Sequence, residues 1–178
     1  MVEERLVWID LEMTGLKPEE NTIIEIATIV TEGDLTVVAE GPAFAITQPE
    51  SELAKMDDWN LTHHTENGLL DRVRNHGIPM AEAEAMTIEF LREHCLQGIS
   101  PLCGNTIGQD RRFLRRYMPE LHDFFHYRSV DVTSIKQLVD RWYPDLPRVT
   151  KPAGHRALDD IRGSIVELEH YREHVFRD

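Results

Sequence analysis

The chain has 178 residues, 41% of them hydrophobic, which is enough for one sizeable core, and we expect a single domain over residues 1–178. Its formal charge of −13 argues against a protein that follows a long phosphate backbone, because such proteins usually present a stripe of Lys and Arg. No apolar run reaches the roughly 18 residues of a membrane helix and no signal-peptide pattern opens the chain, so we expect a cytoplasmic protein without membrane contact.

The first third of the chain predicts strands. Three apolar segments rich in β-branched residues cover residues 5–13, about 22–31 and about 36–47. Turn residues separate them: Gly15 with Pro18, and then Gly33 with Asp34. Because such short connections join antiparallel neighbours, these segments predict an antiparallel meander.

Beyond Pro49 the apolar spacing becomes helical. We predict helices near residues 51–58, 66–75, 79–96, 107–117, 133–142 and 156–175, and short strands near 100–104 and 127–130. Strands first, then strands alternating with helices, is the order typical of a mixed sheet flanked by helices. The sequence therefore predicts an α/β fold, with no repeat or linker that divides it.

Two acids close the first predicted strand. Asp10 and Glu12 follow the apolar run of residues 6–9, and side chains two apart in a strand point to the same face. The two carboxylates should therefore converge. Taken alone, an Asp-x-Glu pair is more often a solvated strand end than a functional site.

A third acid, Asp110, shares the apolar face of its predicted helix with Phe113, Leu114 and Tyr117. A carboxylate that faces a core is costly unless a cation or an arginine meets it. Both partners, a metal ion or an arginine of the same segment, are open at this point.

The last predicted helix brings a fourth acid. If it begins near residue 156, Asp160 borders the inward stripe whereas Asp159 points away from it, so Asp160 is the better ligand candidate. His155 lies just before this helix, where it could reach a metal site, although a lone loop histidine is usually just exposed.

The four acids come from three distant segments, and like charges a few ångströms apart raise one another's pKa. Divalent cations resolve that conflict. Sites made of carboxylate oxygens suit Mg²⁺ or Mn²⁺, and pairs of such ions are a recurrent arrangement for hydrolysing phosphodiesters.

Residues 10–15 (DLEMTG), 104–110 (GNTIGQD) and 155–160 (HRALDD) resemble the three exonuclease motifs of the DEDDh superfamily and, within it, the oligoribonuclease family. The resemblance extends over essentially the whole chain. It implies a ribonuclease H-like fold, with a mixed five-stranded sheet whose first three strands are antiparallel, and 3′→5′ exonuclease activity on very short RNA, diribonucleotides included, that releases nucleoside 5′-monophosphates.

The resemblance also implies roles for the acids. Asp10, Glu12 and Asp160 would hold the divalent ion that activates the attacking water, and Asp10 and Asp110 would hold a second ion. The ions would be Mg²⁺ or Mn²⁺, and His155 would be the general base.

In the same family the matching leucine and tryptophan stack on the substrate bases. Leu16 and Trp59 occupy those positions here, although each could equally be a core residue on sequence alone. The family further implies a homodimer whose second subunit closes over the 5′ end of the substrate, so that no stable complex with a long strand is expected. The remaining residues expected at the substrate are Thr106, Tyr127, Arg128, Thr133 and Ser134.

Two other functions remain open. An exonuclease that acts on longer strands, such as a proofreading subunit, would need a basic or aromatic track, against which the charge of −13 argues. A non-catalytic metal-stabilised binding module would have no use for a base beside the metal, and an assay with and without EDTA separates it from an enzyme.

Overall fold

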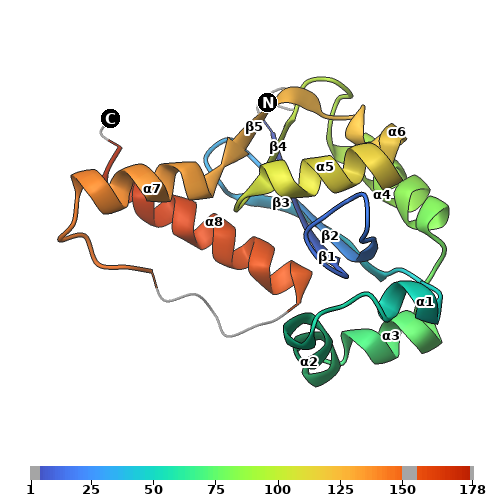
Figure 1. Ribbon diagram of the computed structural model, residues 1–178. Coiled ribbons are helices and arrows are strands. Elements are labelled where there is room, and N and C mark those ends of the chain that lie inside the picture. The colour runs from blue at the N-terminus through green and yellow to red at the C-terminus, as the bar shows by residue number, and fades with distance from the viewer. Residues whose placement is uncertain (1–4, 150–155, 177–178) are drawn as a thin grey trace.

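A computed structural model describes residues 5–149 and 156–176, and its centre is a five-stranded mixed sheet (Figure 1). The strands are β1 (Leu6–Met13), β2 (Ile23–Thr31), β3 (Val37–Ala45), β4 (Pro101–Gly104) and β5 (His126–Asp131). Their order is β3-β2-β1-β4-β5, with β1, β2 and β3 antiparallel and β4 and β5 parallel to β1. The predicted mixed sheet with its antiparallel first half is therefore confirmed.

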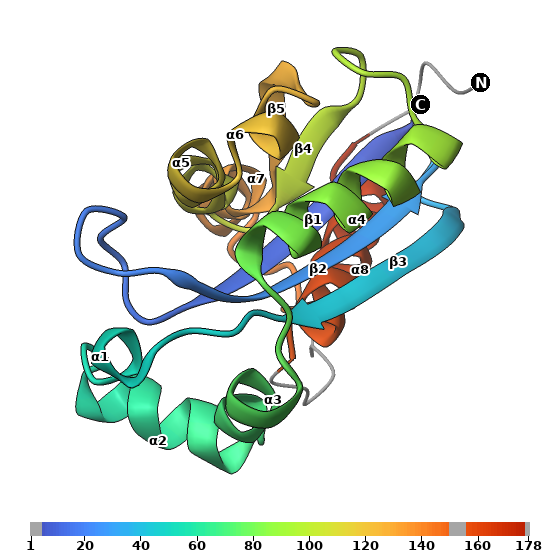
Figure 2. The ribbon, with the colours of Figure 1, turned by 90° about the vertical axis from the view of Figure 1, so that its right-hand side faces the viewer.

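Helices cover both faces of this sheet (Figure 2). One face carries α4 (Met80–His94), α5 (Ile107–Tyr117) and α6 (Pro119–His122), and the other carries α7 (Val132–Trp142) and α8 (Ala157–His174). A third group packs against the start of β2 and the end of β3 and consists of α1 (Glu50–Leu53), α2 (Asp58–Glu66) and α3 (Leu69–His76).

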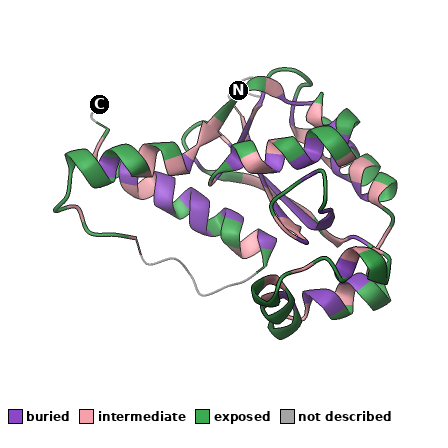
Figure 3. Cartoon of the chain, viewed as in Figure 1, coloured by how far each residue is buried: buried purple, intermediate pink, exposed green. Residues whose placement is uncertain are grey.

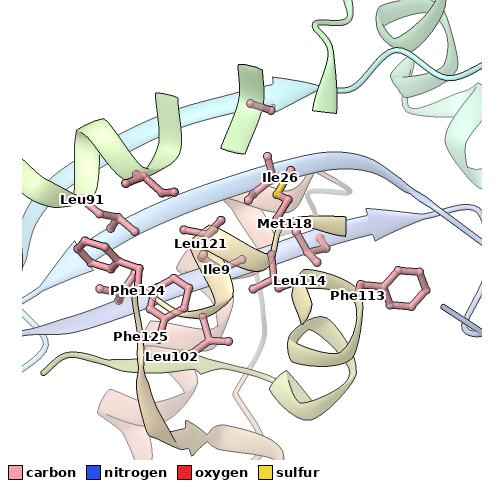
Figure 4. Packing of buried hydrophobic residues seen from close by; sticks show 14 of the residues in the cluster. Ile9, Ile26, Leu91, Leu102, Phe113, Leu114, Met118, Leu121, Phe124 and Phe125 are labelled. Carbon is pink, nitrogen blue, oxygen red and sulfur yellow. The ribbon is translucent and has the colours of Figure 1, made fainter. Parts of the chain in front are cut away.

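The two faces of β1 belong to different cores, because successive strand side chains point to opposite sides. Val7, Ile9 and Leu11 join the cluster under α4, α5 and α6, part of which Figure 4 shows around Ile9. Trp8 joins the cluster under α7 and α8, fully buried, and its Nε1–H donates to Thr31 Oγ1 at 3.0 Å. By the same alternation, the side chains at positions 10 and 12 face the α8 side of the sheet.

Burial is concentrated in the central strands and on the inner sides of the helices (Figure 3). All nine residues of β2 are buried, because the strand lies between β1 and β3 and has helices on both faces. One of these nine is an acid, Glu25, with 1% of its surface exposed. None of the helices in the described segments combines the length and the apolar character that a membrane crossing requires.

The predicted helix at 51–58 is wrong in its extent. The structure has the single turn α1 there, ending at Leu53, and a separate helix α2 that begins at Asp58. Asp57 ends the intervening turn as the N-cap of α2, since its Oδ1 accepts from Asn60 N–H at 2.8 Å. The sequence also missed the single turn of α6.

Candidate active site

Three acids from two distant parts of the chain meet beside the C-terminal half of β1. Asp10 and Glu12 lie on the strand face that α8 covers, and Asp160 lies in the first turn of α8. Each of the three offers a carboxylate oxygen, and these oxygens all lie within 4.8 Å of one another. The structure thus brings together three of the four acids singled out in the sequence in one compact group of ligand atoms.

The register of α8 explains why Asp160 joins this group and Asp159 does not. Ala157 and Ile161 are buried in the cluster that contains Trp8, which sets the rotation of the helix. Asp159 instead pairs with Arg162, whose guanidinium nitrogen lies 3.0 Å from its Oδ1.

Asp110 approaches the same place from the opposite face of the sheet. It lies in the first turn of α5, which starts directly after β4, and only 7% of its surface is exposed. Its Oδ1 accepts a hydrogen bond from the backbone N–H of Leu11 at 3.1 Å, between the positions of Asp10 and Glu12. The acid thus faces the core as expected, and its described hydrogen bond is to the backbone of β1.

Burial and mutual repulsion raise the pKa values of these acids. The pKa of Asp10 is raised well above its ordinary range, first by burial and then by the charge of Asp110. Burial and the neighbouring charge of Asp160 raise the pKa of Glu12 to about 8. Burial raises the pKa of Asp110 to about 7, and the hydrogen bond from the Leu11 N–H, which lowers this pKa, offsets only part of the effect.

These acids fit a divalent cation. Carboxylate oxygens are the ligands that hard ions such as Mg²⁺ and Mn²⁺ prefer. A cation would remove the repulsion that raises the pKa values, because an opposite charge at short range favours the ionised carboxylate. Asp10, Glu12 and Asp160 offer carboxylate oxygens close enough together to hold one such ion, and the buried Asp110 adds a further carboxylate near Asp10.

Sequence reasoning missed a fifth acid, Glu25. It lies directly opposite Glu12 in the register of β1 and β2, and Arg72 Nη1 donates to its Oε1 at 2.7 Å. Its charge contributes to the raised pKa values of both Asp10 and Glu12. The available signal was a single acid within the otherwise uncharged run of residues 22–31.

Leu16 and Trp59, which the sequence left open between core and substrate contact, are both exposed. Leu16 follows β1 with 70% of its surface exposed, and Trp59 in α2 has 67% exposed. The ring of Trp59 stacks on that of His63 with centroids 4.8 Å apart. Two large apolar side chains therefore face solvent at the expected base-contact positions.

Thr106 and Thr133 lie together at the sheet end where β4 and β5 finish. The backbone N–H of Thr106 donates to Asp131 Oδ1 and to Thr133 Oγ1, both at 3.0 Å. Asp131 pairs with Gly104, the last residue of β4, and the exposed Ser134 is in the first turn of α7.

Tyr127 and Arg128 lie at the other end of β5. Tyr127 is four residues before Asp131, about 13 Å along a strand, and 74% of its surface is exposed. The guanidinium of Arg128 lies 5.3 Å from the centre of the Tyr127 ring. The structure therefore separates this pair from the two threonines. The expected general base, His155, is outside the described residues.

Comparison with known proteins assigns this chain to a family. The model of the RNase T exonuclease family matches residues 7–168. Curated relatives named oligoribonuclease include one from Shewanella loihica, 58% identical over 98% of this chain and 97% of the relative. Another, from Coxiella burnetii, is 55% identical over 97% of this chain and 95% of the relative.

Among solved structures, exonuclease I has the same fold. One of its structures superposes with a TM-score of 0.76 at 14% identity, over 96% of this chain. A zinc-bound complex of the Escherichia coli enzyme with single-stranded DNA gives the same TM-score and identity over 97% of this chain. This chain spans about two fifths of the length of those proteins, 41% in both cases.

Proposed function

The chain belongs to the RNase T exonuclease family and, within it, to the oligoribonucleases, and from this premise we propose that it is a 3′→5′ exoribonuclease that degrades very short RNA to nucleoside 5′-monophosphates. One observation carries the proposal. The carboxylates of Asp10, Glu12 and Asp160 converge within 4.8 Å beside the buried Asp110, an acid set that matches phosphodiester hydrolysis with divalent ions.

We propose that the acids hold two ions, Mg²⁺ or Mn²⁺. Asp10, Glu12 and Asp160 would hold the first, and Asp10 together with Asp110 the second. When bound, such ions lower the pKa of water and stabilise the charge that develops on a leaving oxygen. His155 takes up the proton of the attacking water, whose oxygen forms the new bond to the terminal phosphorus as the upstream 3′-oxygen departs.

For the substrate, we propose a pocket two nucleotides long. Leu16 and Trp59 contact the bases, and their exposure supports that role, because base stacking on an aromatic side chain is worth roughly 1–3 kcal/mol. The 5′ phosphate would be bound by hydroxyl groups and a guanidinium, which suit its charge and hydrogen-bonding capacity. The residues proposed to contact it are Tyr127, Arg128, Thr133 and Ser134, and Thr106 is a further proposed substrate contact.

We propose further that the working form is a cytoplasmic homodimer. The length of β5 separates Tyr127 from Thr133 within one chain, so a second copy could bring this segment to the 5′ phosphate. Exposed apolar side chains on β5, α7 and the residue after α7 support such an interface: Tyr127, Leu138, Trp142 and Tyr143.

Product analysis by chain length tests the proposal. RNAs of two to about ten nucleotides, labelled at the 5′ end, are incubated with Mn²⁺ or with EDTA. We expect mononucleotide release with Mn²⁺ that is fastest on the dinucleotide and absent with EDTA. Equal rates at all lengths would favour an exonuclease for longer strands, and no metal-dependent release would favour a binding module.

A further inference from the structure

Glu25 is a buried acid with two donors from different parts of the chain. Its Oε1 accepts from Arg72 Nη1 at 2.7 Å, and its Oε2 accepts from the backbone N–H of Ala157 at 3.3 Å. A carboxylate so deeply buried is costly unless it is paired and hydrogen-bonded. These two contacts therefore explain how an acid persists in the middle of β2.

The contact with Ala157 stabilises the start of α8 as well as the carboxylate of Glu25. Ala157 is the first residue of α8, and the first N–H groups of a helix have no acceptor within the helix. The N-cap residue, Arg156, gives α8 no side-chain cap. Glu25 supplies an acceptor from the sheet instead, and its negative charge lies at the positive end of the helix dipole.

Arg72 contacts the other carboxylate oxygen of Glu25, the one that Ala157 does not contact. Its Nε and Nη2 are buried and have no hydrogen-bond partner among the described residues, so Glu25 is the acceptor that anchors this guanidinium. Arg72 lies in α3, which follows α2 in the same helical group. Two hydrogen bonds, from Arg72 to Glu25 and from Ala157 to Glu25, thus connect α3, β2 and the start of α8.

We propose that Glu25 is a positioning residue, which fixes the start of α8 so that Asp160 stays against Asp10 and Glu12, and that Arg72 holds Glu25 in this task. Asp160 is one helical turn beyond Ala157, so movement at the helix start moves its carboxylate. The inference rests on the proposed role of these acids as ligands of divalent ions. Side chains that orient metal ligands typically contribute 10–100-fold to metal affinity.

The variant Glu25→Gln tests the contact with little change of shape. Its amide has one acceptor oxygen, which cannot serve Arg72 and Ala157 as both carboxylate oxygens do. We expect faster hydrogen exchange of the Ala157 amide in metal-free protein, followed by NMR. We also expect Mn²⁺ affinity, measured by calorimetry without RNA, to fall about 10–100-fold. Saturating Mn²⁺ should restore RNA turnover to within a few-fold of wild type, which global damage would not allow.

A matched pair of variants on α3 tests the anchor. Arg72→Met removes the half-buried partner of the buried Glu25, whereas Arg74→Met breaks the exposed pair with Glu50, whose atoms are also 2.7 Å apart. We expect only Arg72→Met to weaken Mn²⁺ binding, with the folded state of each variant checked by circular dichroism. Equal effects of the two variants would overturn the role of Arg72.

The outcomes separate this inference from the proposed function. Wild-type protein that binds Mn²⁺ and degrades dinucleotides, together with Glu25→Gln and Arg72→Met variants of unchanged Mn²⁺ affinity, would overturn the positioning role alone. Wild-type protein that binds no Mn²⁺ would overturn the proposed function and, with it, the positioning role.

Discussion

Adjacent residues in α8 have different surroundings, and this predicts different consequences of the same substitution. Asp160 lies in the acid group, whereas Asp159 pairs with Arg162 on the helix surface. Asp160→Asn should reduce RNA turnover by at least 100-fold, because it removes a proposed metal ligand. Asp159→Asn should leave turnover within about two-fold, because an exposed ion pair contributes little. Single-turnover rates on a diribonucleotide measure both, and the reverse ranking would refute the assignment.

The raised pKa of Glu12 predicts a pH-dependent stability in metal-free protein. Its pKa is about 8 in the folded chain against an ordinary 4.5, so the folded state binds a proton that the unfolded state has lost. The free energy of unfolding should therefore fall as pH rises from about 5 to about 8, by up to about 1.4 kcal/mol per pH unit for one group.

Urea unfolding with a chelator, at several pH values, measures this slope. Glu12→Gln should make the slope less negative, since its amide does not titrate. Added Mn²⁺ should stabilise the wild type most at high pH, where the carboxylates are ionised. The interpretation fails if wild type and Glu12→Gln have the same slope.

His155 gives a prediction of another kind, because a general base acts on rate and not on binding. His155→Ala should lower kcat about 10²–10⁴-fold and leave Mn²⁺ affinity within a few-fold of wild type. Wild-type turnover should fall below about pH 6.5, where an ordinary imidazole becomes protonated. A kcat that is flat from pH 5 to 8 would argue against this base.

Strand alternation was sufficient to predict that Asp10 and Glu12 share a face, and helical spacing was sufficient to prefer Asp160 to Asp159. Neither pattern could reveal Glu25. Its partners Arg72 and Ala157 are 47 and 132 residues away, and only the packed sheet and helices bring them to it. An isolated acid in a buried strand indicates that a partner exists, without saying which one.

At the scale of elements, the helical group α1–α3 was the hardest part to predict. Residues 58–66 contain few apolar residues at helical spacing, and of α2 only His64 is buried. The helix is marked instead by its N-cap, Asp57, a signal that the apolar pattern does not contain. The longer helices α4, α5 and α8 were predicted because each buries a continuous apolar stripe.

The exposed Trp59 in α2 predicts an effect on substrate binding without an effect on stability. Trp59→Ala should weaken dinucleotide binding by about 5–150-fold, because a base stack is worth roughly 1–3 kcal/mol. Stability should change little, since 67% of the tryptophan is already exposed. Leu61→Ala, on the same helix with 45% exposed, is the matched control. Similar effects of the two variants on the dinucleotide Kd would contradict the stacking role.

At the scale of the whole molecule, the topology gathers the chemistry at one end of the sheet. Because β4 and β5 run parallel to β1, their C-terminal ends lie at the same end of the sheet as Asp10 and Glu12, in the C-terminal half of β1. The sequence predicted the antiparallel first three strands from their short connections and a mixed sheet from the later alternation of strands with helices, and the resemblance implied five strands. The sequence could not place β5 with respect to a second copy of the chain, because an interface depends on surfaces and not on periodicity.

A variant at the far end of β5 tests the proposed dimeric pocket. Arg128→Ala should slow cleavage of a 5′-phosphorylated dinucleotide at least ten-fold more than cleavage of a seven-nucleotide RNA. The reason is that a contact to the 5′ phosphate of the dinucleotide is made only when the RNA strand ends after its second nucleotide. The ratio of kcat/KM values for the two RNAs measures this, and equal slowing of both would refute the cap.

The three tryptophans differ in their exposure, so the intrinsic fluorescence of the protein can report on substrate binding. Trp8 is sealed in the core with its indole N–H bonded to Thr31, whereas Trp59 and Trp142 are each about two thirds exposed. Acrylamide should therefore quench the red-shifted emission of Trp59 and leave the blue-shifted emission of Trp8, whereas Trp142 should be quenched in a monomer and shielded in the proposed dimer. A dinucleotide stacked on Trp59 should shield part of the quenchable emission, so that binding can be followed without a label.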